Sequence, residues 1–192
     1  IAQPCPAIVN YIQMYKPELI KYLAPADSPM VHTIKMIKEF YPKYRNYKIA
    51  VISPCAAKKR EFEETGYGDY NITYSSIKNY FSKNKIQLQK YEKIDFMNPS
   101  AERAVLFSTP GGLMKTAVRE LPEIEDKIRK IEGTGVIYHY LDDYIKSIKS
   151  KKAPLILDCL NCENGCNGGT GTDSIEKRAD ELEYEVEKRS SE

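Results

Sequence analysis

Short apolar runs that end in turn residues alternate along this chain with amphipathic, helix-like patterns. The run YKIAVISPC at residues 47–55 is β-branched and closes at Pro54, and PLILDCLNC at residues 154–162 is a similar run near the end. Alternation of this kind is typical of α/β proteins with parallel sheets. The expected strands lie in residues 47–55, 71–76, 103–112, the first part of 135–150, and 154–162.

Helical patterns flank these strands. Near the N-terminus, Pro6 suits the first turn of a helix, and Pro17 should kink or split that helix. Residues 29–41, PMVHTIKMIKEFY, predict a second amphipathic helix. Apolar residues repeat at helical spacing in the first helix, at Ile8, Ile12, Tyr15, Leu19 and Leu23. The pattern as a whole predicts an α/β fold in which parallel-sheet lobes are flanked by helices.

The last stretch, residues 173–192, should be a further helix. Asp173 and Glu176 form a capping-box pattern at its start. An apolar stripe of this kind either packs on its own domain or forms a coiled-coil link to another one, and its short length favours the first. The stripe consists of Ile175, Ala179, Leu182 and Val186.

Length and charge exclude several classes of protein. A chain of 192 residues is expected to form a single globular unit. It has 29 basic and 27 acidic residues, so its charge makes no case for nucleic acid or an anionic membrane as a partner. No stretch approaches the roughly 20 apolar residues that span a bilayer, and the start lacks a secretion signal. We expect a cytoplasmic protein and, since it starts without methionine, a fragment of a larger chain.

The candidate chemistry lies in the cysteines. Their odd number and uneven spacing do not suit a disulfide framework. The last three form a C-x-x-C-x-x-x-C pattern, which is one ligand short of a four-sulfur site. A zinc site would need a second close pair, whereas iron–sulfur clusters accept thiolates from distant segments. The cysteines are Cys5, Cys55, Cys159, Cys162 and Cys166.

Cys5 and Cys55 each stand where they could supply the missing ligand. Cys5 precedes Pro6 at a helix start, where free backbone N–H groups favour a thiolate. Cys55 ends a strand in SPCAAKK, with Lys58 three residues further on. Glycines in the last loop would let backbone N–H groups approach the sulfurs closely. They are Gly165, Gly168, Gly169 and Gly171.

Four ordered segments resemble the successive signatures of the catalytic domain of iron-only (FeFe) hydrogenases. The segments begin QPCPAIVN, SPCAAKKREFE, FSTPGGLMKTAVRE and CENGCNGG. The family pattern runs T-S-C-C-P, M-P-C-x-x-K-x-x-E, T-G-G-V-M and M-A-C-x-x-x-C-x-x-G-G. Four motifs in order are far more specific than any one of them. The resemblance implies a family-like region over residues 1–172, without the part that normally precedes it, followed by residues 173–192 as a C-terminal amphipathic helix that could act as a linker.

The resemblance also implies an iron–sulfur site between the lobes. A 4Fe–4S cluster would have four thiolate ligands, and the last of them would bridge to a di-iron subsite that carries CO and cyanide. The implied ligands are Cys5, Cys55, Cys162 and Cys166, with Cys166 as the bridge.

Other positions take their expected roles from the same resemblance. Lys58 matches a lysine that donates to a cyanide of the subsite, and Glu61 matches a carboxylate on the family's proton route. A loop whose backbone would lie close to the di-iron site contains Pro110, Gly111 and Gly112.

The sequence departs from the family at the proton relay. Pro4 stands where the family has a proton-transferring cysteine, and Ala24 replaces a serine of the same relay. Neither side chain can carry a proton. Cys159 has no counterpart in the family pattern, and it could be a spectator, an alternative ligand or a redox-sensing thiol.

These departures from the family pattern lead us to rank three expected functions. The first is an iron–sulfur protein of the family that senses hydrogen or redox state and passes it to a signalling module. The second is an active hydrogenase, which would need an electron donor or acceptor and would catalyse the reduction of two protons to H2. The third is a zinc-stabilised structural or interaction domain. Losing a relay group slows turnover but leaves cluster binding intact, which favours the sensor.

Overall fold

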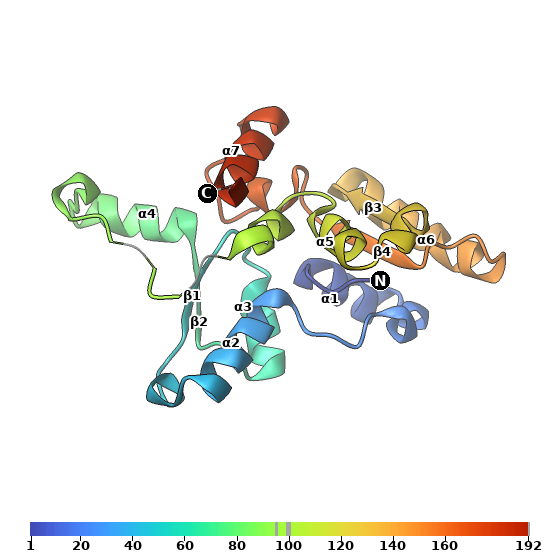
Figure 1. Cartoon of the computed structure of the whole chain (residues 1–192), viewed down its shortest axis with the longest axis horizontal. Coiled ribbons are helices and arrows are strands. Elements are labelled where there is room, and N and C mark those ends of the chain that lie inside the picture. The colour runs from blue at the N-terminus through green and yellow to red at the C-terminus, as the bar shows by residue number, and fades with distance from the viewer. Residues whose placement is uncertain (95, 99–100, 192) are drawn as a thin grey trace.

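The computed structural model describes residues 1–94, 96–98 and 101–191. Within this part of the chain, four short strands form two separate parallel pairs. One pair joins β1 (Ala50–Ser53) to β2 (Tyr70–Thr73), and the other joins β3 (Ile128–Glu132) to β4 (Ile156–Leu160). Each pair is the centre of one lobe, and the two lobes lie side by side (Figure 1). The expected α/β fold with parallel-sheet lobes flanked by helices is confirmed.

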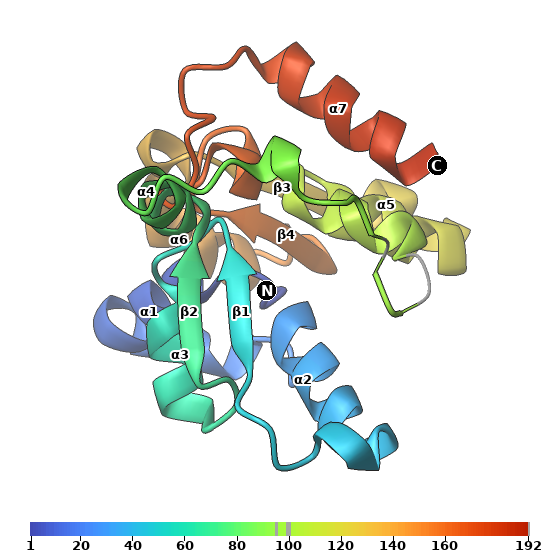
Figure 2. The same ribbon diagram turned by 90° about the vertical axis from the view of Figure 1, so that its left-hand side faces the viewer.

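Helices surround both strand pairs (Figure 2). They are α1 (Pro6–Tyr15), α2 (Pro29–Phe40), α3 (Lys58–Thr65), α4 (Tyr74–Lys83), α5 (Gly112–Glu120), α6 (Thr134–Lys149) and α7 (Ala179–Ser191). Short 3-10 helices lie between them, at η1 (Pro17–Tyr22), η2 (Pro42–Tyr44), η3 (Leu88–Lys90), η4 (Glu102–Ser108), η5 (Pro122–Lys127) and η6 (Gly165–Gly168).

The two helices expected near the N-terminus are present. Pro6 is the first residue of α1, and the chain breaks into η1 at Pro17 because proline lacks the N–H that would continue the helix. Ser28 caps α2 by accepting a hydrogen bond from the backbone N–H of Val31. Proline at the next position, Pro29, suits the first turn. These local signals place the starts of both helices beside the cavity described below.

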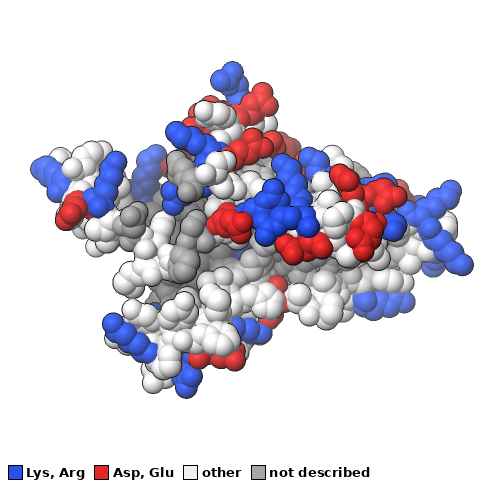
Figure 3. Space-filling view, viewed as in Figure 1, with Lys and Arg blue, Asp and Glu red and all other residues white. Residues whose placement is uncertain are grey.

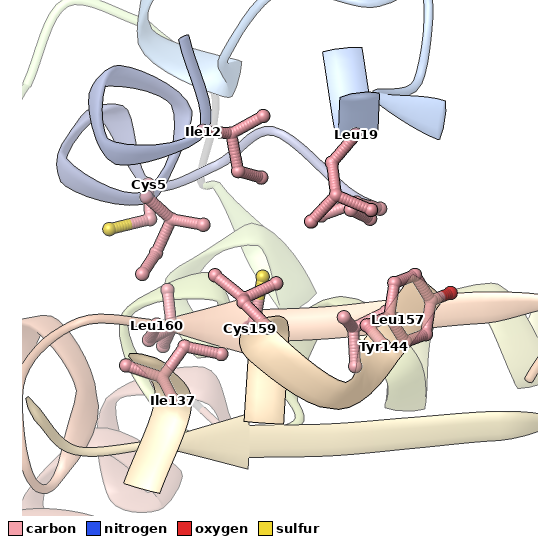
Figure 4. Close-up of a cluster of buried hydrophobic side chains, with 11 residues drawn as sticks. Cys5, Ile12, Leu19, Ile137, Tyr144, Leu157, Cys159 and Leu160 are labelled. Carbon is pink, nitrogen blue, oxygen red and sulfur yellow. The ribbon is translucent and has the colours of Figure 1, made fainter. Parts of the chain in front are cut away.

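The main hydrophobic core lies in the lobe of β3 and β4. Helices α1 and α6 and the segment η1 converge on β4 there (Figure 4). Several side chains in this core are completely excluded from solvent, and they are Ile8, Ile12, Leu19, Ile137, Leu141 and Leu157. The spacing expected for the first helix is thus a core-facing stripe at its first, second and fourth positions.

The first residues of the chain lie against β4 and so set the position of α1. The backbone N–H of Ala2 donates to the carbonyl of Leu157 at 2.9 Å, and that of Ala24 donates to the carbonyl of Ile1 at 2.8 Å. The terminal amine of Ile1 donates to the carbonyl of Tyr22 at 2.7 Å. These bonds hold the start of α1 near the carboxyl end of β4.

Two expected strands are wrong. Residues 103–112 lie mostly in η4, and residues 135–150 belong entirely to α6 apart from the last. The buried positions of α6 are Ile137, Leu141 and Tyr144, which is helical spacing. The run of apolar residues before Asp142 and Asp143 resembles a strand locally. The helical spacing of the buried residues over the whole segment shows that it is a helix.

The strand β3 was not expected. Its sequence IRKIE places Arg129 and Lys130 in the middle of the strand, and both are exposed. A strand that is buried on neither face at its centre carries little apolar pattern. Its pairing with β4, in the register that sets Ile131 beside Cys159, is decided by the partner strand.

The C-terminal helix begins later than the capping-box pattern predicted. α7 starts at Ala179, and Asp173 forms an ion pair with Lys78 of α4 at 2.6 Å instead of capping a helix. Leu182 is buried and α7 packs on η4, whereas Ile175 is 69% exposed. The helix therefore packs on its own domain, and its use as a linker stays a prediction.

Charged side chains of both signs share the surface. On the face shown in Figure 3, blue basic and red acidic side chains are intermixed over α5 and α7. Across the residues that the structure describes, no helix combines the length and the apolar character needed to cross a bilayer.

The buried face of α6 provides a test of the core. Replacing Leu141 with alanine should lower the free energy of unfolding by about 2–5 kcal/mol, because it leaves a cavity against β4. Val136→Ala on the same helix removes a side chain that is 57% exposed, and should change stability by less than about 0.5 kcal/mol. Urea denaturation of both variants measures the difference, and equal losses would contradict this packing.

Candidate functional site

A cavity of about 420 Å³ lies between the two lobes. Its walls come from α1, α2, α3, the ends of β1 and β4, and the loop around η6. The thiol-bearing residues that line it are Cys5, Cys55, Cys162 and Cys166. Four cysteines from three distant segments therefore surround one space.

Each cysteine reaches the cavity through a local feature of the fold. Cys55 and Cys162 each follow the last residue of a strand, β1 or β4, by two positions. Cys5 is the N-cap residue of α1, and Cys166 lies in η6. Since the carboxyl ends of β1 and β4 both border the cavity, the two strand pairs aim their cysteines at the same place.

Burial dominates the electrostatics of these thiols. It raises the pKa of Cys5 and of Cys55, and it raises the pKa of Cys166 to about 12. The other cavity cysteines raise the pKa of Cys166 further, because their negative charge would repel its thiolate. The four thiols are thus close enough to influence one another, and a bound cation would reverse this preference for the neutral form.

Backbone N–H groups oppose the cost of burying a thiolate here. The backbone N–H groups of Ile8, Asn161 and Ala7 favour the thiolate of Cys5 and so oppose the rise in its pKa. Those of Ala57 and Lys58 do the same for Cys55. Such donors favour the anionic, metal-ligating form of a cysteine.

Two glycines let the loop of Cys166 approach the cavity wall. A Cβ atom on Gly169 would lie 2.4 Å from the carbonyl oxygen of Pro54 and 2.8 Å from that of Cys166. A Cβ atom on Gly165 would lie 2.4 Å from the carbonyl oxygen of Ser108. Both contacts are impossible for a larger residue, so glycine is required at these positions.

The sulfurs line the cavity from several sides. Over the described part of the chain, no three His, Cys, Asp or Glu side chains are grouped closely enough to hold a single metal ion. Ligands of one zinc ion must all lie about 2.3 Å from one point, whereas a polynuclear cluster takes its thiolates at different iron atoms. The arrangement of the donors therefore suits a cluster better than a single ion.

Comparison with known proteins agrees with this arrangement. The family model described as the iron-only hydrogenase large subunit, C-terminal domain, matches residues 1–170. The chain belongs to this family.

Solved structures of [FeFe]-hydrogenases share the fold. HydA(deltaEFG) gives a TM-score of 0.71 at 17% identity, over 96% of this chain and 64% of the other. A glutamate-to-alanine variant of HydA1 from Chlamydomonas reinhardtii gives 0.72 at 17% identity, with 96% and 65% covered. The chain therefore spans less than two thirds of the hydrogenase chains that it resembles.

Lys58 and Glu61, expected in catalytic roles in this family, form a buried ion pair. The Nζ atom of Lys58 lies 2.5 Å from Glu61 Oε2 and donates to the hydroxyl of Ser28 at 2.9 Å. The side chains of Lys58 and Glu61 are 7% and 13% exposed. Lys58 lines the cysteine cavity, whereas Glu61 lines a second cavity of about 260 Å³ together with Ser28. The pair thus connects two cavities.

The loop of Pro110, Gly111 and Gly112 lies behind the wall of the cysteine cavity. Phe107 and Ser108, just before it, line the cavity instead. All three loop residues are buried, and a Cβ atom on Gly112 would lie 1.8 Å from the carbonyl oxygen of Leu106. The structure brings the four cysteines and Lys58 together and places this loop one layer further out.

Buried Asp158 of β4 holds the helix that follows this loop. Its carboxylate accepts the backbone N–H of Met114, in the first turn of α5, at 2.9 Å. Burial raises the pKa of Asp158, and the bond to Met114 opposes that shift. In the sequence, this contact could have been suspected from Asp158 alone, because it is an acidic residue within the apolar run PLILDCL.

Cys159, the cysteine without a family counterpart, faces the hydrophobic core (Figure 4). It is 1% exposed, and burial raises its pKa to about 12. It is not among the residues that line the cavity. Its interpretation as a spectator stays a prediction.

The structure adds residues that sequence reasoning missed. Ser28, Met30, Phe107 and Asn161 all contact the site or its buried ion pair. Asn161 could have been found from the sequence because it precedes Cys162, and Ser28 because it precedes the proline that starts α2. Met30 and Phe107 join the cavity only through tertiary packing.

The Lys58–Glu61 pair generates a stability test. Glu61→Ala should lower the free energy of unfolding by about 3–5 kcal/mol, because it leaves a buried ammonium group without its counter-ion. The control is Glu63→Ala on the same helix, where the Lys59–Glu63 distance is 3.9 Å and Glu63 is 65% exposed. That change should cost less than about 1 kcal/mol. Chemical denaturation compares the two, and a control as damaging as Glu61→Ala would contradict a special role for burial.

Proposed function

We propose that this chain is a sensory iron–sulfur domain of the iron-only hydrogenase family. It binds a 4Fe–4S cluster and responds to hydrogen or to redox state. The observation that carries the proposal is the convergence of four cysteines on one cavity between the lobes. The proposed ligands are Cys5, Cys55, Cys162 and Cys166.

The residues present fit such a cluster. Four thiol groups match the ligand number of a 4Fe–4S cluster, and backbone N–H groups already point at two of the sulfurs. Gly169 lines the cavity and lets the loop of Cys166 approach the carbonyl oxygen of Pro54 more closely than any residue with a side chain could. When bound, the cluster supplies one-electron redox chemistry, while the protein supplies ligands, hydrogen bonds and a low dielectric.

A di-iron subsite with CO and cyanide ligands is the second part of the proposed cofactor. Cys166 would bridge to it. The cavity has room beyond the thiols that is lined by apolar residues, among them Pro4, Met30 and Phe107. Lys58 presents the side-chain cation of this wall, and an ammonium group is suited to hold an anionic ligand.

The assignment to sensing depends on Pro4. This residue lines the cavity next to Cys5, where the family pattern has a proton-transferring cysteine. Proline has no ionisable group, so it cannot pass a proton across the cavity. General acid–base catalysis typically contributes about 10²–10⁴ in rate, so a site without its first relay group can bind a cluster yet turn over slowly.

An active hydrogenase is the second candidate, and one observation favours it. The buried Lys58–Glu61 pair leads from the cysteine cavity to the second cavity, which gives protons a different route. In that case an electron donor or acceptor replaces the signalling module as partner.

The first test measures cluster binding. After anaerobic reconstitution, the protein should contain about four iron atoms and four acid-labile sulfides per chain. Cys55→Ser should remove most of both, because an alcohol is a poor ligand for the cluster. Cys159→Ser is the matched control and should keep full iron and sulfide, since Cys159 lies outside the cavity. Bound zinc without sulfide in the unaltered chain would instead support a zinc-stabilised structural domain.

The second test separates sensor from enzyme. After loading with a synthetic di-iron cofactor, Pro4→Cys should raise the rate of hydrogen evolution from a reduced dye by about 10²–10⁴. Pro4→Ala also removes the proline but adds no ionisable group, so its rate should stay low. Infrared bands of CO and cyanide verify loading of each variant. Equal rates for loaded Pro4→Cys and the unaltered chain would contradict the relay argument.

A further inference from the structure

Asn161 contacts two of the proposed cluster ligands at once. It follows the last residue of β4 and lines the cysteine cavity. Its backbone N–H favours the thiolate form of Cys5, because it opposes the burial that raises the pKa of that thiol. Its side-chain amide nitrogen lies 3.9 Å from the sulfur of Cys162, within the range of an N–H···S hydrogen bond. One residue thus directs donors at sulfurs from two separate segments.

The orientation of the Asn161 amide is set by its other neighbour. The hydroxyl of Tyr138 on α6 donates a hydrogen bond to Asn161 Oδ1. A thiolate can only accept hydrogen bonds, so the amide satisfies both neighbours when its oxygen faces Tyr138 and its nitrogen faces Cys162. The tyrosine therefore holds the donor in the direction that the sulfur requires.

Tyr138 is itself held in place by helix packing. Its ring lies against Tyr11 of α1, with ring centroids 4.4 Å apart and planes inclined by 51°. This contact joins α6 to the helix that begins at Cys5. The hydrogen-bond chain from Tyr138 through Asn161 to Cys162 is thus anchored by the same helices that position the first ligand.

We propose that Asn161, oriented by Tyr138, raises the reduction potential of the cluster that Cys5, Cys55, Cys162 and Cys166 hold. The inference rests on the proposed function. Reduction adds one negative charge to the cluster and its thiolates, and N–H donors stabilise the more negative state. Hydrogen bonds to the sulfurs are among the factors that set the potential of an iron–sulfur cluster. In a sensor, this potential decides at which ambient redox state the domain responds.

The family pattern quoted above has alanine where this chain has Asn161, so Asn161→Ala is the informative change. It removes the side-chain donor and keeps the backbone N–H to Cys5. At a fixed solution potential near the midpoint, we expect the ratio of reduced to oxidised cluster to fall about tenfold, which corresponds to about 59 mV for one electron. A redox titration with a chemical reductant, followed by electron paramagnetic resonance of the reduced cluster, measures this shift.

A second variant tests the orienting role and guards against a folding defect. Tyr138→Phe keeps the ring against Tyr11 but removes the hydroxyl, so it should shift the potential in the same direction by a smaller amount. Tyr140→Phe is the control, because it removes a hydroxyl from the same helix while that ring packs on Tyr144 at 5.6 Å. Its potential should equal that of the unaltered protein.

The outcomes separate this inference from the function on which it rests. Iron and sulfide are quantified first in every sample. An unaltered chain that binds no cluster overturns both the proposed function and the role of Asn161. If the unaltered protein and Asn161→Ala are both fully loaded and share one midpoint potential, only the inference on Asn161 fails. An unchanged potential in loaded Tyr138→Phe, with a shift in Asn161→Ala, would remove the orienting role of the tyrosine.

Discussion

The convergence of four cysteines from three distant segments on one cavity is the constraint on which the rest of this structure depends. Burial and the neighbouring cysteines favour the neutral form of Cys166 and raise the pKa of its thiol to about 12. A metal cluster would reverse that preference, because thiolates are its ligands, and its binding would release protons. Since the cysteines come from both lobes, the same binding would connect the lobes and stabilise their arrangement.

The fold meets this constraint with very little regular sheet. Two pairs of parallel strands, each of four or five residues, end at the cavity and carry Cys55 and Cys162 just beyond their last residues. Gly169 lets the loop of Cys166 lie against Pro54, just beyond β1, and Gly165 lets the same loop approach Ser108 of η4. Short strands are sufficient here because each has to position only one cysteine, while helices α1 and α6 contribute most of the hydrophobic core.

Binding a cluster and moving protons are separate properties of this site. The four cysteines of the family pattern all line the cavity, as the proposed cluster requires. The proton relay is altered at Pro4, and the buried Lys58–Glu61 pair is the polar connection that leads away from the cavity. Asn161 and Tyr138 add a hydrogen-bond chain to a ligand sulfur, which bears on electron transfer and not on proton transfer. This combination is the basis of the proposal that the domain reports a redox state.

The sequence by itself determined the α/β class, the starts of α1 and α2 and the cysteines worth considering, because proline, helical periodicity and ligand spacing act over a few residues. It did not reveal β3, because the exposed Arg129 and Lys130 remove the apolar pattern of a strand and only the pairing with β4 defines it. It also misplaced the start of α7, since Asp173 pairs with distant Lys78 instead of capping a helix. Only the tertiary structure decided that Cys159 faces the core while Asn161 and Cys162 face the cavity, because α1 and α6 pack over Cys159 within β4, whereas the strand ends at Leu160 and the next residues border the space between the lobes.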